Sequence, residues 1–178
     1  MPGKIRIIIA DDHPIFRGGL RQIISADESI EIIGEADNGE KALEIIQELK
    51  PDIAVLDIDM PKKTGLDVLR ELKDSSTKII FLTMYAEEDI FDEAMDFGIK
   101  GYVLKDSAVN DIIECILSVN EDNYYISPNV SNLLVNRRNK SKNLIKKNPE
   151  LGNLTKTERN ILRFISENKT SKEIAEVL

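Results

Sequence analysis

The chain has 178 residues, 42% of them hydrophobic, and neither a membrane-spanning apolar run nor a signal peptide, which predicts a globular cytoplasmic protein with one full domain and a smaller unit. One cysteine and one histidine exclude an internal disulfide and argue against a structural zinc site. Residues 1–122 carry 13 basic and 27 acidic residues and residues 123–178 carry 11 and 5, which indicates two units with different partners.

Short apolar runs rich in Ile and Val alternate with amphipathic stretches over the first part of the chain. The predicted strands are 4–10, 30–36, 52–57, 78–83 and 101–104. The predicted helices are 14–26, 38–49, 65–73, 87–97 and 108–120. Strands and helices in alternation indicate βαβ units with right-handed crossovers, so we expect an α/β fold built on a parallel sheet.

Polar residues stand at the ends of four of these strands. Asp11 and Asp12 follow the first strand, Asp57 ends the third, Thr83 ends the fourth and Lys105 follows the fifth. In a parallel sheet these ends share one edge, where open α/β folds bind their ligands. Each residue alone is an ordinary cap, turn, strand or surface residue. Together they place three carboxylates, a hydroxyl and an ammonium in one pocket, which suits a divalent metal and a phosphoryl group.

The motifs around these residues resemble the receiver domain of bacterial two-component response regulators. They are IIIADDHPIFRGGL, VLDIDMPKKTGLDVL, IIFLTMYAEED and GIKGYVLKD, and the similarity covers roughly residues 4–120. The DDHP opening and the LKD ending are most similar to the NarL/FixJ subfamily. The resemblance implies a doubly wound, flavodoxin-like domain over 1–122, with five parallel strands in the order 2-1-3-4-5.

The resemblance also implies a role for each residue of the predicted pocket. Asp57 would be the phosphoacceptor, taking a phosphoryl group from a sensor histidine kinase or a small phosphodonor to form an aspartyl phosphate. Asp12 and Asp57 would bind Mg2+, with Asp11 acting directly or through water. The backbone carbonyl of Asp59 would complete the protein ligands, and Lys105 would pair with a phosphoryl oxygen.

Two further residues would report the phosphorylation to the rest of the molecule. Thr83 would hydrogen-bond a phosphoryl oxygen, and Tyr102 would be the aromatic residue that turns inward when Thr83 moves. Tyr102 can equally be a half-buried strand residue. Asp59 and Tyr85, which flank the site in the pattern of this family, are expected to tune the lifetime of the aspartyl phosphate. A phosphorylation-dependent homodimer is a further expectation, because such receivers shift a two-state equilibrium.

A phosphatase interpretation uses the same residues. Asp57-Ile58-Asp59 matches the D-x-D motif of haloacid-dehalogenase-type phosphatases, which also form aspartyl phosphates. Those enzymes place the motif after the first strand and usually follow it with x-Thr or x-Val. Here the motif follows the third predicted strand and Pro61 occupies the later position. We therefore expect a signalling protein that assists only its own phosphorylation and dephosphorylation, with the phosphatase as a remote alternative.

The sequence changes character after residue 121. Ser127 and Pro128 predict the start of a short helix that reaches about Arg138, within a basic linker over 123–150. Residues 151–178 resemble the first part of a LuxR-type helix-turn-helix domain and stop before the recognition helix, which would contact bases. The basic part can also be a solvated tail.

These patterns predict a response regulator that is phosphorylated on Asp57 and controls transcription through the C-terminal helix-turn-helix. Promoter DNA would be the partner of the complete protein, and the 178 residues would bind it weakly or not at all. The alternative is a phosphorylation-gated protein-interaction module without DNA output.

Overall fold

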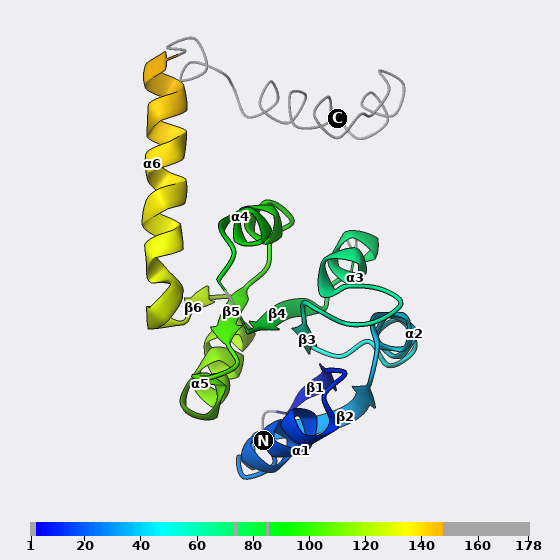
Figure 1. Cartoon of the computed structure of the whole chain (residues 1–178). Coiled ribbons are helices and arrows are strands. Elements are labelled where there is room, and N and C mark those ends of the chain that lie inside the picture. Colours follow the sequence, from blue (N-terminus) through cyan, green and yellow to red (C-terminus); the bar gives the residue numbers. More distant parts are fainter. Residues whose placement is uncertain (1–2, 73–74, 85, 148–178) are drawn as a thin grey trace. The chain divides into compact units, whose positions relative to one another are not determined.

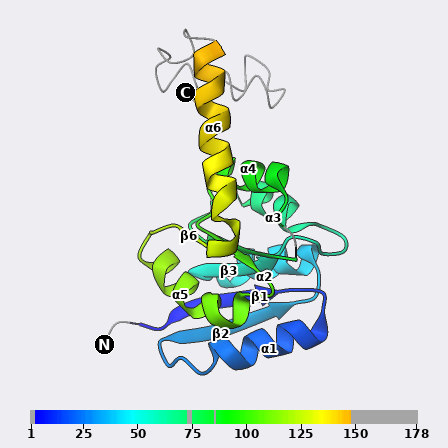
Figure 2. The ribbon, with the colours of Figure 1, turned by 60° about the vertical axis from the view of Figure 1, so that its left-hand side comes forward.

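The computed structural model describes residues 3–72, 75–84 and 86–147. Within these residues a six-stranded sheet, parallel throughout, has the order β2-β1-β3-β4-β5-β6 (Figures 1 and 2). The strands are β1 Ile5–Ala10, β2 Ile30–Ala36, β3 Ile53–Asp57, β4 Lys78–Thr83, β5 Gly101–Leu104 and β6 Tyr125–Ile126. The helices are α1 Pro14–Ile24, α2 Gly39–Leu49, α3 Gly65–Glu71, α4 Glu88–Asp96, α5 Ala108–Asn120, the 3-10 helix η1 Pro128–Val130 and α6 Ser131–Lys147.

Helices cover both faces of the sheet, and each face has its own apolar core. Successive residues of a strand point to opposite faces, so Ile7 and Ile9 of β1 belong to one core and Ile8 and Ala10 to the other. The first core also contains the buried residues of α1 and α5, and the second contains those of α2, α3 and α4 (Figure 1). Burial on both faces explains why the strands are nearly continuous apolar runs.

The predicted fold is confirmed, with one correction to the number of strands. The five predicted strands and the order 2-1-3-4-5 are present, but the sheet has six strands because Tyr125 and Ile126 pair with Gly101 and Tyr102. The backbone N–H of Tyr125 donates to the carbonyl of Lys100 at 2.9 Å. A strand this short carries no periodic pattern, so the sequence does not predict it.

The helix predicted after Ser127 is longer than expected. The helix α6 continues to Lys147, because 131–147 contains no Gly or Pro and is rich in Leu, Lys and Arg, which favour helix. The structure divides into two compact units, Met1–Leu134 and Val135–Leu178, and the described part of the second is the 135–147 portion of α6. The expected helix-turn-helix segment, 151–178, lies outside the described residues.

Ser127 occupies the predicted N-cap position but uses its side chain elsewhere. It precedes η1 without making a capping hydrogen bond to it. Its buried hydroxyl donates to the carboxylate of Asp111 and lies 3.1 Å from the hydroxyl of Ser107, both at the start of α5. Its backbone N–H donates to the carbonyl of Tyr102 at 2.9 Å. The side chains of Ser107, Asp111 and Ser127 thus fasten the segment after α5 to the start of α5, and the backbone of Ser127 fastens it to β5.

Candidate functional site

The carboxyl ends of β1, β3 and β5 bring two carboxylates and one ammonium into contact. Lys105 Nζ lies 2.7 Å from Asp57 Oδ2 and 2.8 Å from Asp11 Oδ2. All three side chains are almost completely buried, with 4%, 2% and 0% of their surface exposed for Lys105, Asp57 and Asp11. Lys105 also lies over the ring of Phe16, 5.0 Å from its centroid. Residues 94 positions apart in the chain therefore form one buried ionic group.

Burial and charge compete within this group. Burial raises the pKa of Asp57 and Asp11 raises it further, whereas the hydrogen bond and charge of Lys105 act in the opposite direction; the net pKa lies above the ordinary value. For Lys105, burial lowers the pKa, but the bonds to Asp11 and Asp57 outweigh it and the pKa is raised. Two carboxylates face one ammonium, so the group keeps an excess negative charge that a cation would offset.

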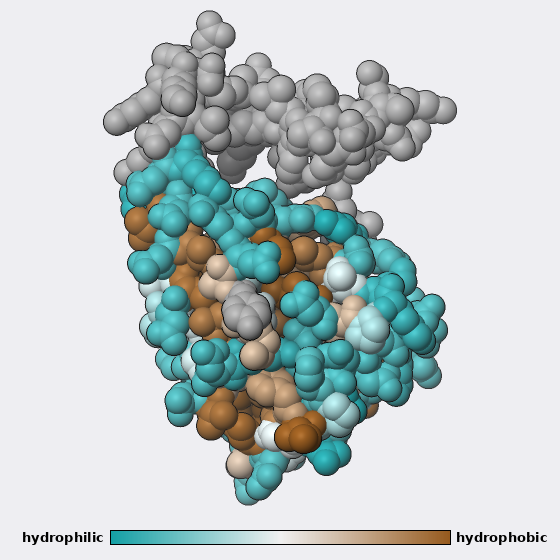
Figure 3. All heavy atoms as spheres, in the orientation of Figure 1, coloured by the Kyte–Doolittle hydropathy of each residue, from teal (hydrophilic) through white to brown (hydrophobic). Residues whose placement is uncertain are grey.

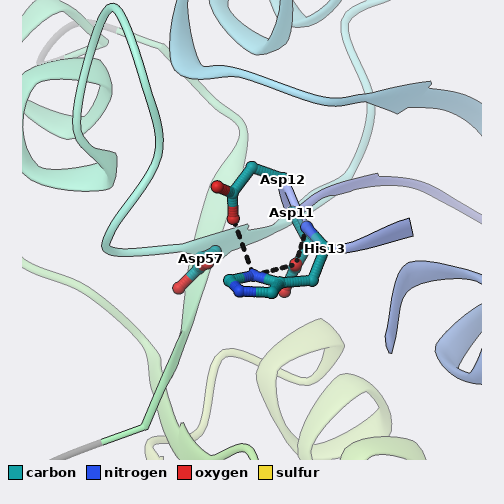
Figure 4. A group of neighbouring side chains, drawn as sticks. All are labelled: Asp11, Asp12, His13 and Asp57. Carbon is teal, nitrogen blue, oxygen red and sulfur yellow. Dashed lines mark hydrogen bonds and ion pairs between the residues drawn. The ribbon is translucent and has the colours of Figure 1, made fainter. Parts of the chain in front are cut away.

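Asp12 and His13 lie beside this group at the end of β1. The four side chains Asp11, Asp12, His13 and Asp57 each offer a ligand atom, and these atoms all lie within 4.8 Å of one another (Figure 4). The Asp11 carboxylate is held in place by the backbone N–H of His13, which donates to its Oδ1 at 2.8 Å. Carboxylate oxygens are the ligands that Mg2+ prefers, so the residues present fit that ion.

Asp59 lies in the loop that follows β3. Its backbone N–H donates to Asp57 Oδ1 at 3.3 Å, and its side chain is exposed. The loop is fastened at two points: Gly65 donates its N–H to the carbonyl of Ile58 at 2.8 Å, and the N–H of Gly39, at the start of α2, donates to the carbonyl of Pro61 at 3.4 Å. The backbone of Asp59 is thereby held next to the carboxylate of Asp57.

Thr83 and Tyr102 lie on neighbouring strands near the same edge. Thr83 is buried at the end of β4, and its carbonyl accepts a hydrogen bond from the N–H of Lys105 at 2.8 Å. Tyr102 is completely buried rather than half-buried, and its ring meets that of Phe91 in α4 edge to face, with centroids 5.1 Å apart. Its hydroxyl has no hydrogen-bond partner among the residues that the structure describes, and burial raises its pKa well above the ordinary value. Tyr85 lies outside the described residues.

His13 is the site residue that the sequence interpretation missed. The only histidine of the chain was considered there for structural zinc alone, a site that needs further Cys or His ligands. Its position directly after Asp11-Asp12 was the available signal. In the structure its ring is two-thirds exposed, yet Nδ1 faces the carboxylates of Asp11 and Asp12.

An apolar groove borders the site on the side of α1. It has a volume of about 320 Å³ and is lined by His13, Ile15, Phe16, Met84 and Lys105. Ile15 is 93% exposed, and Val109 at the start of α5 is 64% exposed. Figure 3 shows apolar surface where α1 and α5 lie in Figure 1. Apolar surface therefore borders the buried ionic group on one side.

Comparison with known sequences identifies a family and close relatives. The response regulator receiver domain matches residues 7–117 of this chain. The transcriptional regulatory protein DesR of Bacillus subtilis is 33% identical over 174 residues, which cover 98% of this chain and 81% of DesR. The oxygen regulatory protein NreC of Staphylococcus carnosus is 32% identical over 179 residues, which cover 98% of this chain and 82% of NreC.

Solved structures similar to this chain are also response regulators. The signal receiver domain of NarL from Mycobacterium tuberculosis superposes with a TM-score of 0.65 at 34% identity, covering 67% of this chain and 98% of that chain. A structure of two RcsB dimers bound to two parallel DNAs covers 98% of this chain and 82% of that chain, with a TM-score of 0.68 at 25% identity.

Proposed function

The chain belongs to the response regulators, sharing its receiver domain with transcriptional regulators of the NarL/LuxR family, and we propose that Asp57 is the residue through which it receives its signal. The observation that carries this proposal is the buried contact of the Asp57 carboxylate with Lys105 Nζ at 2.7 Å, beside Asp11 and Asp12. The donor would be a sensor histidine kinase or a small phosphodonor, met in the cytoplasm.

Each residue of the site has a different role in the proposed phosphoryl transfer. A carboxylate oxygen of Asp57 forms the new O–P bond while the bond from phosphorus to the donor breaks and its electron pair leaves with the donor. Lys105, which pairs with the carboxylates of Asp57 and Asp11 before transfer, then pairs with a phosphoryl oxygen. Mg2+, held by Asp11, Asp12, Asp57 and the Asp59 carbonyl, would supply charge neutralisation for the transferring group.

Thr83 and Tyr102 are proposed to carry the signal away from the site. Thr83 ends β4 beside Lys105, where its hydroxyl can bond a phosphoryl oxygen. Tyr102 lies one strand further, buried against Phe91 of α4. A shift of Thr83 towards the phosphoryl group would change the space available to Tyr102 and so bias a two-state equilibrium around α4.

Intact mass spectrometry after incubation with acetyl phosphate and Mg2+ tests the assignment. The wild type is expected to gain one phosphoryl group, and Asp57→Asn to gain none, because the amide cannot act as the nucleophile. Asp27→Asn, at an exposed turn, serves as the matched control and should be phosphorylated like the wild type. A chelator should block the reaction, and an adduct that persists in Asp57→Asn would refute the proposed phosphoacceptor.

DNA is the proposed target of the output, through the part of the chain after the receiver. We propose that 1–122 is the receiver, 123–150 the connection and 151–178 the start of a LuxR-type helix-turn-helix. RcsB, which is similar over 98% of this chain, binds DNA as dimers, and a phosphorylation-dependent homodimer is proposed here by analogy.

No helix of the described residues has the length and apolarity that crossing a membrane requires.

A polypeptide of these 178 residues carries only the first part of such a motif and is expected to bind promoter DNA weakly, in the range of about 1–100 μM that is typical of non-specific contacts. An electrophoretic mobility shift assay, with and without acetyl phosphate, measures this. Operator binding with a Kd near 10 nM, the range of about 10 nM or tighter found for specific complexes, would contradict the expectation. A variant to which a recognition helix has been restored could still fail to bind DNA. If phosphorylation then controls its binding to a protein partner, the protein-interaction module is favoured.

A further inference from the structure

We propose that His13 is a nitrogen ligand at the phosphoacceptor site and that it allows a divalent transition ion with affinity for imidazole, such as Co2+ or Zn2+, to replace Mg2+ there. The inference rests on the proposed function, since it concerns the same carboxylates. It adds a ligand that the receiver roles assigned above do not use. The choice of bound metal would then depend on the presence of a histidine at position 13.

The distances from His13 Nδ1 to two carboxylate oxygens lie just below and just above those that separate neighbouring ligands on one ion. Nδ1 lies 2.8 Å from Asp12 Oδ1 and 3.5 Å from Asp11 Oδ1 (Figure 4). Two ligand atoms that each bind a metal at about 2.1 Å are separated by roughly 3.0 to 3.4 Å for octahedral to tetrahedral angles. The nitrogen therefore faces two carboxylates at once, and Asp57 offers a further ligand atom within 4.8 Å of the others.

The backbone of His13 is restrained on both sides of the residue. His13 is the N-cap residue of α1 and is extended, with φ −89° and ψ 104°, as expected of a residue that precedes proline. Its own N–H is bonded to Asp11 Oδ1 at 2.8 Å. Its side chain makes no capping hydrogen bond to α1, so the ring is not needed for the helix. Pro14 and Asp11 thus restrain the backbone of His13, while Nδ1 is directed towards the carboxylates of Asp11 and Asp12 rather than towards α1.

Mg2+ and transition ions are expected to depend differently on His13, because they prefer different ligand atoms. Mg2+ is a hard cation that takes oxygen ligands and keeps several waters, so an imidazole adds little to its binding. Imidazole nitrogen suits Zn2+, Co2+ and Ni2+, which bind a mixed nitrogen and oxygen site more tightly than magnesium does. A transition ion held by His13, Asp12 and Asp57 would occupy the carboxylates needed for Mg2+. Binding of the two ions is therefore mutually exclusive.

The test compares Co2+ and Mg2+ binding to the full chain by isothermal titration calorimetry. His13→Gln is expected to bind Co2+ at least roughly tenfold more weakly than the wild type, the lower end of the loss seen when even an outer-shell partner of a metal is removed. Its affinity for Mg2+ should change by less than about twofold, because oxygen ligands dominate that site. Asp12→Asn is the matched variant, and it should weaken binding of both ions.

The single histidine provides a direct spectroscopic readout. Because His13 is the only imidazole in the chain, a paramagnetically shifted imidazole proton signal in the Co2+ complex can come from no other residue. The only cysteine, Cys115, is buried in α5, and burial raises its pKa, so it does not compete for the ion. The shifted signal is expected in the wild type and should vanish in His13→Gln and on titration with excess Mg2+.

The outcomes distinguish this inference from the proposed function. Wild-type protein that binds Mg2+ and is phosphorylated, but whose Co2+ affinity is unchanged by His13→Gln, would overturn the role of His13 alone. Absence of the shifted imidazole signal at saturating Co2+ would do the same. Failure of the wild type to bind Mg2+ or to be phosphorylated would instead remove the proposed function. A selective loss of Co2+ affinity together with the imidazole signal supports the assignment.

Discussion

Methionine in place of Lys105 is expected to lower the free energy of unfolding by about 3 kcal/mol near neutral pH in metal-free buffer, the loss typical of removing one partner from a buried ion pair. The change leaves the carboxylates of Asp11 and Asp57, which are 0% and 2% exposed, without their counter-charge. Methionine keeps most of the volume of the lysine stem, so the loss reports charge rather than packing. Urea unfolding followed by circular dichroism measures it.

The loss should depend on pH with a defined sign. The folded-state pKa of Asp57 is already raised above its unfolded value, so its contribution to stability is fully present below the unfolded pKa and is lost as the pH rises through the folded one. Removing Lys105, which opposes that rise, raises the folded pKa of Asp57 further. The difference between Lys105→Met and the wild type should therefore shrink as the pH falls towards the ordinary carboxyl range, about pH 4.

The matched control for this prediction is Lys62→Met. Lys62 pairs with Glu40 at 3.0 Å, but the two side chains are 60% and 52% exposed, so water already solvates both charges. This variant should unfold at nearly the urea concentration of the wild type at every pH. An equal loss in both variants, or a loss in Lys105→Met that does not change with pH, would contradict the buried ionic group as its cause.

Gly39→Ala is expected to destabilise the fold by about 3 kcal/mol, the upper end of the usual range for overpacking. A Cβ at Gly39 would lie 2.0 Å from the carbonyl oxygen of Lys63 and 2.7 Å from its carbonyl carbon. Both are backbone atoms of the loop after β3, so no side-chain rotation relieves the clash. The loop must move away from α2, and the backbone of Asp59 with it, so Mg2+ affinity should fall together with stability.

Gly18→Ala provides the opposite result as a control. Gly18 lies inside α1, and a Cβ there meets nothing within 4 Å. Alanine favours helix over glycine by about 1 kcal/mol, so this variant should be more stable than the wild type and bind Mg2+ equally. Urea unfolding and calorimetric Mg2+ titration of both variants give the comparison. Wild-type stability in Gly39→Ala would show that the contact between α2 and the loop is not tight.

The fold could be predicted because its strands are buried on both faces and its helices on one. Those two burial patterns have different periods, and both are visible in the sequence from Ile5 to Asn120. The edge strand Tyr125–Ile126 has too few residues for a period. The side-chain partner of Ser127 also could not be predicted, because Asp111 is 16 residues away and is brought near only by the packing of α5.

The candidate site was predictable to the extent that strand ends determine it. Asp11, Asp57 and Lys105 meet because each stands where a parallel strand ends at the same edge. His13 escaped prediction because the direction of its ring depends on the turn between β1 and α1. The full burial of Tyr102 depends on Phe91 of α4 and on the sixth strand, which pairs with β5 at Tyr102 itself.

That sixth strand has a practical consequence for work on the receiver alone. A fragment that ends at residue 122 would lack Tyr125 and Ile126 and leave the outer side of β5 as an open edge with unpaired N–H and carbonyl groups. Exposed strand edges template pairing with other chains and hence aggregation. The same fragment would lose Val130 and Leu133, which are buried in the core with Phe91 and Tyr102. A fragment that ends after Leu134 keeps the edge covered and is the better behaved reagent for titration and spectroscopy.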